Sequence, residues 1–227
     1  GQYRYTSKDS IVIYDLLNLA DELDFKGKID SAFKIIASAT LLSRNKNFLR
    51  GEGFAILKQA DLTLKSKGSI ESVLSACKKG INLGYTIEDY FIIGLGKHQI
   101  SQYYRDKAAW DSCIYFLNEA SKDYTKIALD EYLAYAYNDL AFALDKKGDY
   151  QEAILYYLKA IPIFEKTDVK KEVANTLNNI ATVYNKLNNR TQAIKYFKQS
   201  IQLSESIRDI KRLAAAYGNL AITYSFT

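Results

Sequence analysis

The sequence is poor in several residue types, and each scarcity excludes a class of protein. It has no methionine, one proline, one histidine and two cysteines among 227 residues. One proline and eleven glycines exclude collagen-like, Pro-rich and Gly-rich chains. The two cysteines, Cys77 and Cys113, lack a CxxC spacing and do not indicate a disulfide framework. Since position 1 is also not methionine, we expect the chain to be a fragment of a longer protein.

Long apolar runs and clusters of like charge are also missing. No run of 18 apolar residues exists, so we expect no membrane insertion. No cluster of five or more like charges forms a polybasic tail. The 31 basic and 26 acidic residues give a net charge of +5, which falls well short of the basic stripe of a nucleic-acid binder. We expect no nucleic-acid partner. Cysteine use leaves the compartment open: we favour the cytoplasm, with the periplasm as the alternative if a leader was removed.

Motifs that carry catalytic or metal chemistry are scarce as well. His98 is the one histidine, and no set of Cys, Asp or Glu with ligand spacing surrounds it. No motif supports a nucleophile paired with a base. Gly94 and Gly96 do not form a phosphate loop, because no strand pattern precedes them and no Lys-Ser/Thr pair follows. Glycines weaken helices, so these two predict a hinge instead. We expect no catalytic residue, no metal and no cofactor, and therefore a protein that is not an enzyme.

What the sequence does contain is an internal repeat of about 40 residues. Its units begin near Ile13, Phe54, Gly94, Ala134, Ala174 and Ala214. One column of mostly small residues comprises Ala20, Asp61, Ser101, Ala141, Ala181 and Ala221. The sequence therefore predicts a lead-in over residues 1–12 and a single repeat domain over residues 13–227. This domain has five complete units and the first half of a sixth.

Each unit predicts two helices joined by a short turn. Apolar residues recur at i, i+3, i+4 and i+7, as in Tyr137, Leu140, Ala141 and Leu144. Gly148 is expected to end one helix in the left-handed conformation, and Asp149 to cap the next. Two helices of about 17 residues fill a 40-residue unit, and no alternating strand pattern competes. The fold class is all-α, a solenoid of about five and a half helix-turn-helix repeats.

The residues Ala141, Gly148, Tyr150, Ala153, Tyr157 and Ala160 reproduce a known pattern of small, turn and aromatic positions. They resemble the tetratricopeptide repeat (TPR) family. The 40-residue spacing is similar to its longer variants in kinesin light chains, Leu-Gly-Asn repeat adaptors and bacterial peptide-sensing regulators. The resemblance implies a right-handed superhelix whose concave groove is lined by the first helix of each unit, and it implies a protein or peptide partner.

The candidate binding residues are polar side chains at positions expected to line that groove. Most are amides, which both donate and accept hydrogen bonds and so can pair with a peptide backbone. The predicted peptide-binding set is Gln99, Tyr135, Asn138, Asp139, Lys146, Asn175, Asn178, Asn179, Thr182, Asn185, Lys186 and Asn219. An alternative stays open, because the same amides could instead bond one helix of the repeat to another.

Two functions are compatible with these observations. The first is a non-catalytic scaffold that binds a protein or peptide segment in its groove. The alternative is the sensory or scaffolding region of a larger bacterial signalling protein, such as a sensor kinase or a helix-turn-helix regulator. The last predicted helix, over residues 214–227, has an uncovered apolar stripe, from which we also expect continuation of the chain or self-association.

Overall fold

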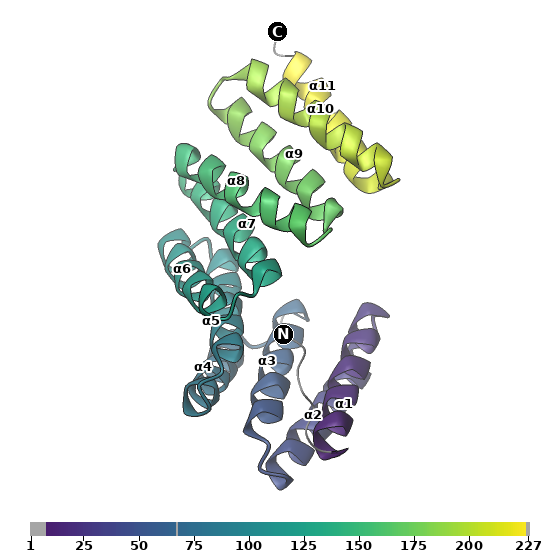
Figure 1. Cartoon of the computed structure of the whole chain (residues 1–227), viewed down its shortest axis with the longest axis vertical. Coiled ribbons are helices and arrows are strands. Elements are labelled where there is room, and N and C mark those ends of the chain that lie inside the picture. The colour runs from purple at the N-terminus through teal and green to yellow at the C-terminus, as the bar shows by residue number, and fades with distance from the viewer. Residues whose placement is uncertain (1–7, 67, 226–227) are drawn as a thin grey trace. The chain divides into compact units, whose positions relative to one another are not determined.

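The computed structural model describes residues 8–66 and 68–225, and this part of the chain consists of helices and short turns without a strand (Figure 1). Its helices have 16 to 18 residues each. They are α1 (Lys8–Phe25), α2 (Ile29–Asn45), α3 (Leu49–Lys65), α4 (Ile70–Thr86), α5 (Tyr90–Asp106), α6 (Trp110–Lys126), α7 (Asp130–Lys147), α8 (Tyr150–Lys166), α9 (Lys170–Lys186), α10 (Arg190–Ser206) and α11 (Ile210–Ser225). The all-α prediction and the two-helix repeat are confirmed.

The helices fall into two compact units, one ending at Ile127 and the other beginning at Ala128. The first holds α1 to α6 and the second holds α7 to α11. Within each unit, helices that follow one another in sequence pack together. The odd-numbered helices are the first helices of the repeats and the even-numbered ones are the second. A single superhelical domain over residues 13–227 stays a prediction, since it concerns how the two units join.

The turns use the left-handed backbone region, as the sequence suggested for Gly148. That residue follows α7 with φ of 99°. Ala108 and Asn188 stand at the corresponding turns with φ of 53° and 57°. The predicted cap at Asp149 is wrong, because its side chain makes no capping hydrogen bond. The carboxylate lies instead 3.5 Å from the ammonium group of Lys147, in the turn just before α8.

Small residues in the predicted columns bring neighbouring helices close together. In the second unit, Ala134 and Ala160 are fully buried and pack with Phe164 and Val173. A second cluster joins Ala141 to buried side chains of α8 and α9. Since a small side chain on one helix leaves room for a large one on its neighbour, each repeat is fixed against the next.

Gly94 and Gly96 serve the same purpose in α5, which favours close packing over the expected hinge. A β-carbon added at Gly94 would lie 2.8 Å from the ring of Tyr124, and one at Gly96 would lie 2.6 Å from Ile81. Both glycines are buried in an uninterrupted helix. Their missing side chains let α5 approach α6 and α4 closely.

Candidate functional site

The predicted binding residues lie on first helices of the repeats. Eleven of them belong to the second unit and one, Gln99, to the first. The eleven are Tyr135, Asn138, Asp139 and Lys146 on α7, Asn175, Asn178, Asn179, Thr182, Asn185 and Lys186 on α9, and Asn219 on α11. Three successive first helices of one unit therefore carry nearly the whole predicted set.

Gln99 is engaged within the first unit. Its side chain is buried. Its amide nitrogen donates to the main-chain oxygen of Leu57 on α3 at 3.1 Å. Its amide oxygen accepts from the thiol of Cys77 on α4 at 3.6 Å. Gln99 therefore bonds α5 to both preceding helices.

The thiol of Cys77 provides a test of this buried contact. Burial, with a smaller contribution from the Asp61 carboxylate, raises the pKa of Cys77 to about 12. The folded chain therefore retains the thiol proton above pH 9, where the unfolded chain loses it. Below pH 9 the thiol therefore does not change the free energy of unfolding, and above pH 9 that free energy falls as the pH rises. Between pH 9 and 10 we expect the free energy of unfolding to fall by about 1 kcal/mol more in the natural chain than in Cys77→Ala. Urea unfolding at both pH values measures the difference, and equal slopes would contradict it.

The polar groups of α7 and α9 are bonded to each other. The hydroxyl of Thr176 donates to the side-chain oxygen of Asn138 at 3.0 Å. The ammonium group of Lys186 contacts both carboxylate oxygens of Asp145, at 2.7 and 2.6 Å. Asp145 is buried, and Lys186 also lies over the ring of Tyr150. Two predicted binding residues, Asn138 and Lys186, thus connect consecutive repeats.

A similar set of bonds joins α9 to α11. The amide of Asn219 donates to the side-chain oxygen of Asn178 at 3.1 Å. The amide of Asn185 donates to the hydroxyl of Thr223 at 2.7 Å. These contacts repeat the α7–α9 connection one repeat further along the chain.

Asn179 faces the preceding helix rather than the neighbouring first helix. It forms a hydrogen bond with the hydroxyl of Tyr157 on α8. Burial and the nearby carboxylates of Asp145 and Asp139 raise the pKa of Tyr157, and the bond to Asn179 opposes this increase. Asn179 thereby pairs with a phenol that is almost completely buried.

The remaining predicted residues are partly open to solvent. Lys146 is exposed and lies 5.1 Å from the ring centroid of Phe142. Tyr135 is half-buried and packs edge-on against Phe164. Burial, followed by nearby carboxylates, raises the pKa of its hydroxyl. Asn175 is half-buried and donates to Glu172 at 3.4 Å.

A cavity of about 430 Å³ opens at the end of this surface. Three of its lining residues belong to the predicted set: Thr182, Asn185 and Lys186. The others are Asn188, Arg190, Ile222 and Thr223, so that α9, α11 and the start of α10 enclose it. None of the lining side chains is acidic and two are basic. The cavity thus offers hydrogen-bonding groups, positive charge and one apolar side chain.

Within residues 8–66 and 68–225, no three His, Cys, Asp or Glu side chains are placed to hold a metal ion. In that same part of the chain no helix has the length and apolar content needed to cross a membrane.

Comparison with known families agrees with the repeat pattern. Models described as tetratricopeptide repeat match residues 133–167 and 172–227. This part of the chain therefore carries tetratricopeptide repeats. These matches fall in the second unit of the TPR protein, the part that carries most of the predicted binding residues. A comparison with curated protein sequences gives no match.

Solved structures extend the TPR likeness to nearly the whole chain. BtubC (BKLC) from P. vanneervenii is 19% identical, with a TM-score of 0.76 over 88% of this chain and 83% of that chain. The STAND protein with a tetratricopeptide repeat sensor from Pyrococcus horikoshii is 17% identical, with a TM-score of 0.77, and the match covers 96% of this chain but 34% of that chain. A Rap protein complexed with Competence and Sporulation Factor is 14% identical, with a TM-score of 0.72 over 93% of this chain and 64% of that chain.

Several residues of this TPR surface were not among those predicted from the sequence. Arg190 and Ile222 line the cavity, and Asp145 is the partner of Lys186. The sequence did contain a signal for the ion pair of Asp145 and Lys186. Asp145 and Lys186 are opposite charges 41 positions apart, which is close to one repeat period, and side chains one period apart lie on neighbouring first helices.

Proposed function

We propose that this TPR protein is a non-catalytic scaffold that binds a peptide segment of another protein on the first helices of its second unit. The observation that carries the proposal is the cavity of about 430 Å³ enclosed by α9, α11 and the start of α10. A volume of this size is within the usual range of binding pockets. Three residues predicted from the sequence line it together.

The chemistry of the cavity suits a peptide main chain. Asn185 and Asn188 carry amides that can donate and accept hydrogen bonds. Lys186 and Arg190 add donors that can pair with carbonyl or carboxylate oxygens. Ile222, which is 55% exposed, provides an apolar contact for one side chain of the ligand. Further along α9 and α7, Asn175, Tyr135 and Lys146 extend the polar surface that an elongated segment could follow.

Several amides of the predicted set are bonded within the repeats, which limits their part in ligand binding. Asn138, Asn178, Asn179 and Asn219 each have a partner inside the unit. A ligand that used these atoms would compete with bonds that hold the helices together. We therefore place the main ligand contacts at the cavity residues Asn188, Arg190 and Ile222. The paired groups, which include Asn185 and Lys186 in the cavity wall, have a supporting role.

The relatives support a binding function of this kind. The Rap protein, whose fold this chain shares, is complexed with Competence and Sporulation Factor. The Pyrococcus horikoshii structure describes its tetratricopeptide repeats as a sensor. A complex with a second molecule and a sensor are both compatible with the binding role proposed here for the cavity.

The experiment tests the cavity directly. Peptides selected from a random display library on the natural chain would be compared by fluorescence anisotropy with the Arg190→Ala/Ile222→Glu variant. We expect binding at least tenfold weaker, because the variant loses one cationic donor and the apolar contact. Both residues are exposed, so the thermal unfolding midpoint should hardly change.

Lys198→Ala is the matched control, since Lys198 is an exposed cation on α10 that does not line the cavity. We expect its affinity to equal that of the natural chain. Equal binding by the natural chain and the cavity variant, at matched stability, would refute the proposed site.

A second candidate function is the sensory region of a larger signalling protein. The match to the Pyrococcus horikoshii protein favours it, because 96% of this chain aligns with 34% of that one. The length of the natural open reading frame decides between a separate scaffold and a sensory region.

A further inference from the structure

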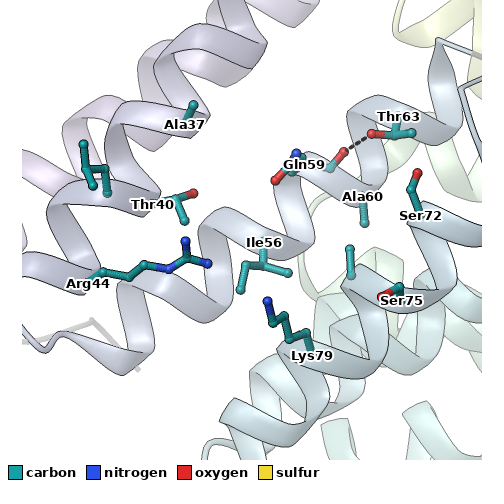
Figure 2. A pocket seen from close by; sticks show the side chains of 12 residues that line it. Ala37, Thr40, Arg44, Ile56, Gln59, Ala60, Thr63, Ser72, Ser75 and Lys79 are labelled. Atoms are coloured by element: carbon teal, nitrogen blue, oxygen red, sulfur yellow. Dashed lines mark hydrogen bonds between the residues drawn. The ribbon is translucent and has the colours of Figure 1, made fainter.

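The first unit holds a cavity of its own, also about 430 Å³ in volume, which the proposed peptide surface does not include. It lies among α2, α3 and α4, as Figure 2 shows. Its walls come from second helices of two successive repeats, and α3 provides the floor. Twelve residues line it, of which two are basic and none is acidic. The charged side chains that line the cavity are therefore all of one sign.

The two basic side chains approach the cavity from opposite walls. Arg44 extends from α2 and Lys79 from α4, and both point toward Ile56 on the floor (Figure 2). Arg44 contacts Glu52 through Nε at 2.7 Å, and its two terminal nitrogens hold no hydrogen bond within the described chain. No described side chain forms an ion pair with Lys79. Because the charge of Lys79 is not neutralised inside the unit, it is available to a ligand.

Neutral hydrogen-bonding groups stand beside these charges. The side chains of Gln59 and Ser75 line the cavity and make no hydrogen bond within the described chain. The hydroxyls of Thr40 and Thr63 donate to the main chain of their own helices. Gln59 and Ser75 can therefore donate to a ligand without breaking an existing bond.

Small apolar residues explain why the space is open. Ala60 and Ala76 line it on α3 and α4, and Ile56 is almost completely buried in the floor. Larger side chains at the two alanines would fill the space. The cavity thus has an apolar base, and its cationic groups stand on two walls.

We propose that this cavity binds a small organic anion, one that carries a carboxylate or phosphate group on a compact apolar body. The anionic group would lie between Arg44 and Lys79, where a guanidinium provides two parallel donors and an ammonium a point charge. The body would rest on Ile56. The site shares no residue with the proposed peptide surface and lies in the other unit, so each proposal can be tested independently of the other.

The test uses phenyl phosphate and benzoate as probes, with neutral benzyl alcohol as the control ligand. Binding to the ¹⁵N-labelled chain is followed by NMR at fixed ionic strength. We expect saturable shifts confined to residues of α2, α3 and α4 with at least one anion, and none with benzyl alcohol. A stronger response to phenyl phosphate assigns the site to phosphorylated ligands, and a stronger response to benzoate assigns it to carboxylates.

Two variants and one matched control locate the site. Lys79→Ala should weaken anion binding at least tenfold, whereas Lys78→Ala, which removes the same charge one exposed position earlier, should leave it within twofold. Ala76→Leu retains both cations and fills the cavity, so it should abolish the shifts. Equal losses in the two lysine variants, equal binding of benzyl alcohol, or no response to either anion would each overturn the proposal.

Discussion

Replacing Lys186 by methionine should lower the free energy of unfolding by about 3 kcal/mol. The reason is the partner it leaves behind. Asp145 is only 7% exposed, and no other basic side chain in the described part of the chain forms an ion pair with it. Removing one member of a buried pair leaves an uncompensated charge, at a cost of about 3–5 kcal/mol. Since Lys186 is one-third exposed, we expect the lower end of this range. Urea unfolding monitored by circular dichroism measures it.

A double variant separates the ion pair from simple loss of a side chain. In Lys186→Met/Asp145→Leu the buried carboxylate is gone, so most of the lost stability should return. Lys195→Met, at an exposed position of α10, should change stability by less than about 0.5 kcal/mol. A double variant as unstable as the single one would show that the ion pair is not the cause. Because Lys186 also lines the cavity, any effect of this substitution on peptide binding needs correction for the unfolded fraction.

The substitution Gly94→Ala should destabilise the first unit by about 1 kcal/mol. A β-carbon at this position would lie 2.8 and 3.0 Å from two ring carbons of Tyr124. That ring is fully buried and cannot move aside freely. Overpacking of this kind costs about 1–3 kcal/mol, which outweighs the gain of about 1 kcal/mol for alanine over glycine in a helix.

Gly218→Ala provides the matched control for this prediction. Gly218 is an exposed residue of α11 whose added β-carbon meets no atom within 4 Å. Alanine there should raise stability by about 0.5–1 kcal/mol. The hinge hypothesis predicts stabilisation in both variants, so unfolding curves that shift in the same direction would favour it over close packing.

The fold could be predicted from the sequence because the repeat imposes the same demands six times. Small residues such as Ala141 recur where helices touch, and a residue such as Gly148 recurs where the chain turns. Each repeat carries the same pattern as the others, so weak local signals add up. The Asp149 cap was predicted from residue type, and that prediction was wrong, although Asn189 caps α10 at the equivalent position one repeat later.

The candidate site was less predictable for a physical reason. A column of amides is expected whether the side chains bind a ligand or bond to the next repeat. The sequence shows neither the partner of Asn178, which is Asn219 one repeat further on, nor the partner of Asn179, a tyrosine on the preceding helix. The cavity of the first unit was missed because its alanines and hydroxyl-bearing residues read as ordinary helix surface.

The spacing of the inter-repeat bonds has a consequence for how the chain folds. Bonds between first helices join residues 37 to 42 positions apart, as between Asp21 and Lys58 or Leu57 and Gln99. No such bond closes a longer loop among the described residues of either unit. Chains dominated by local contacts have low contact order and fold quickly. Folding of either unit can therefore start at one helical pair and spread to its neighbours, each step costing the closure of a single loop of about 40 residues.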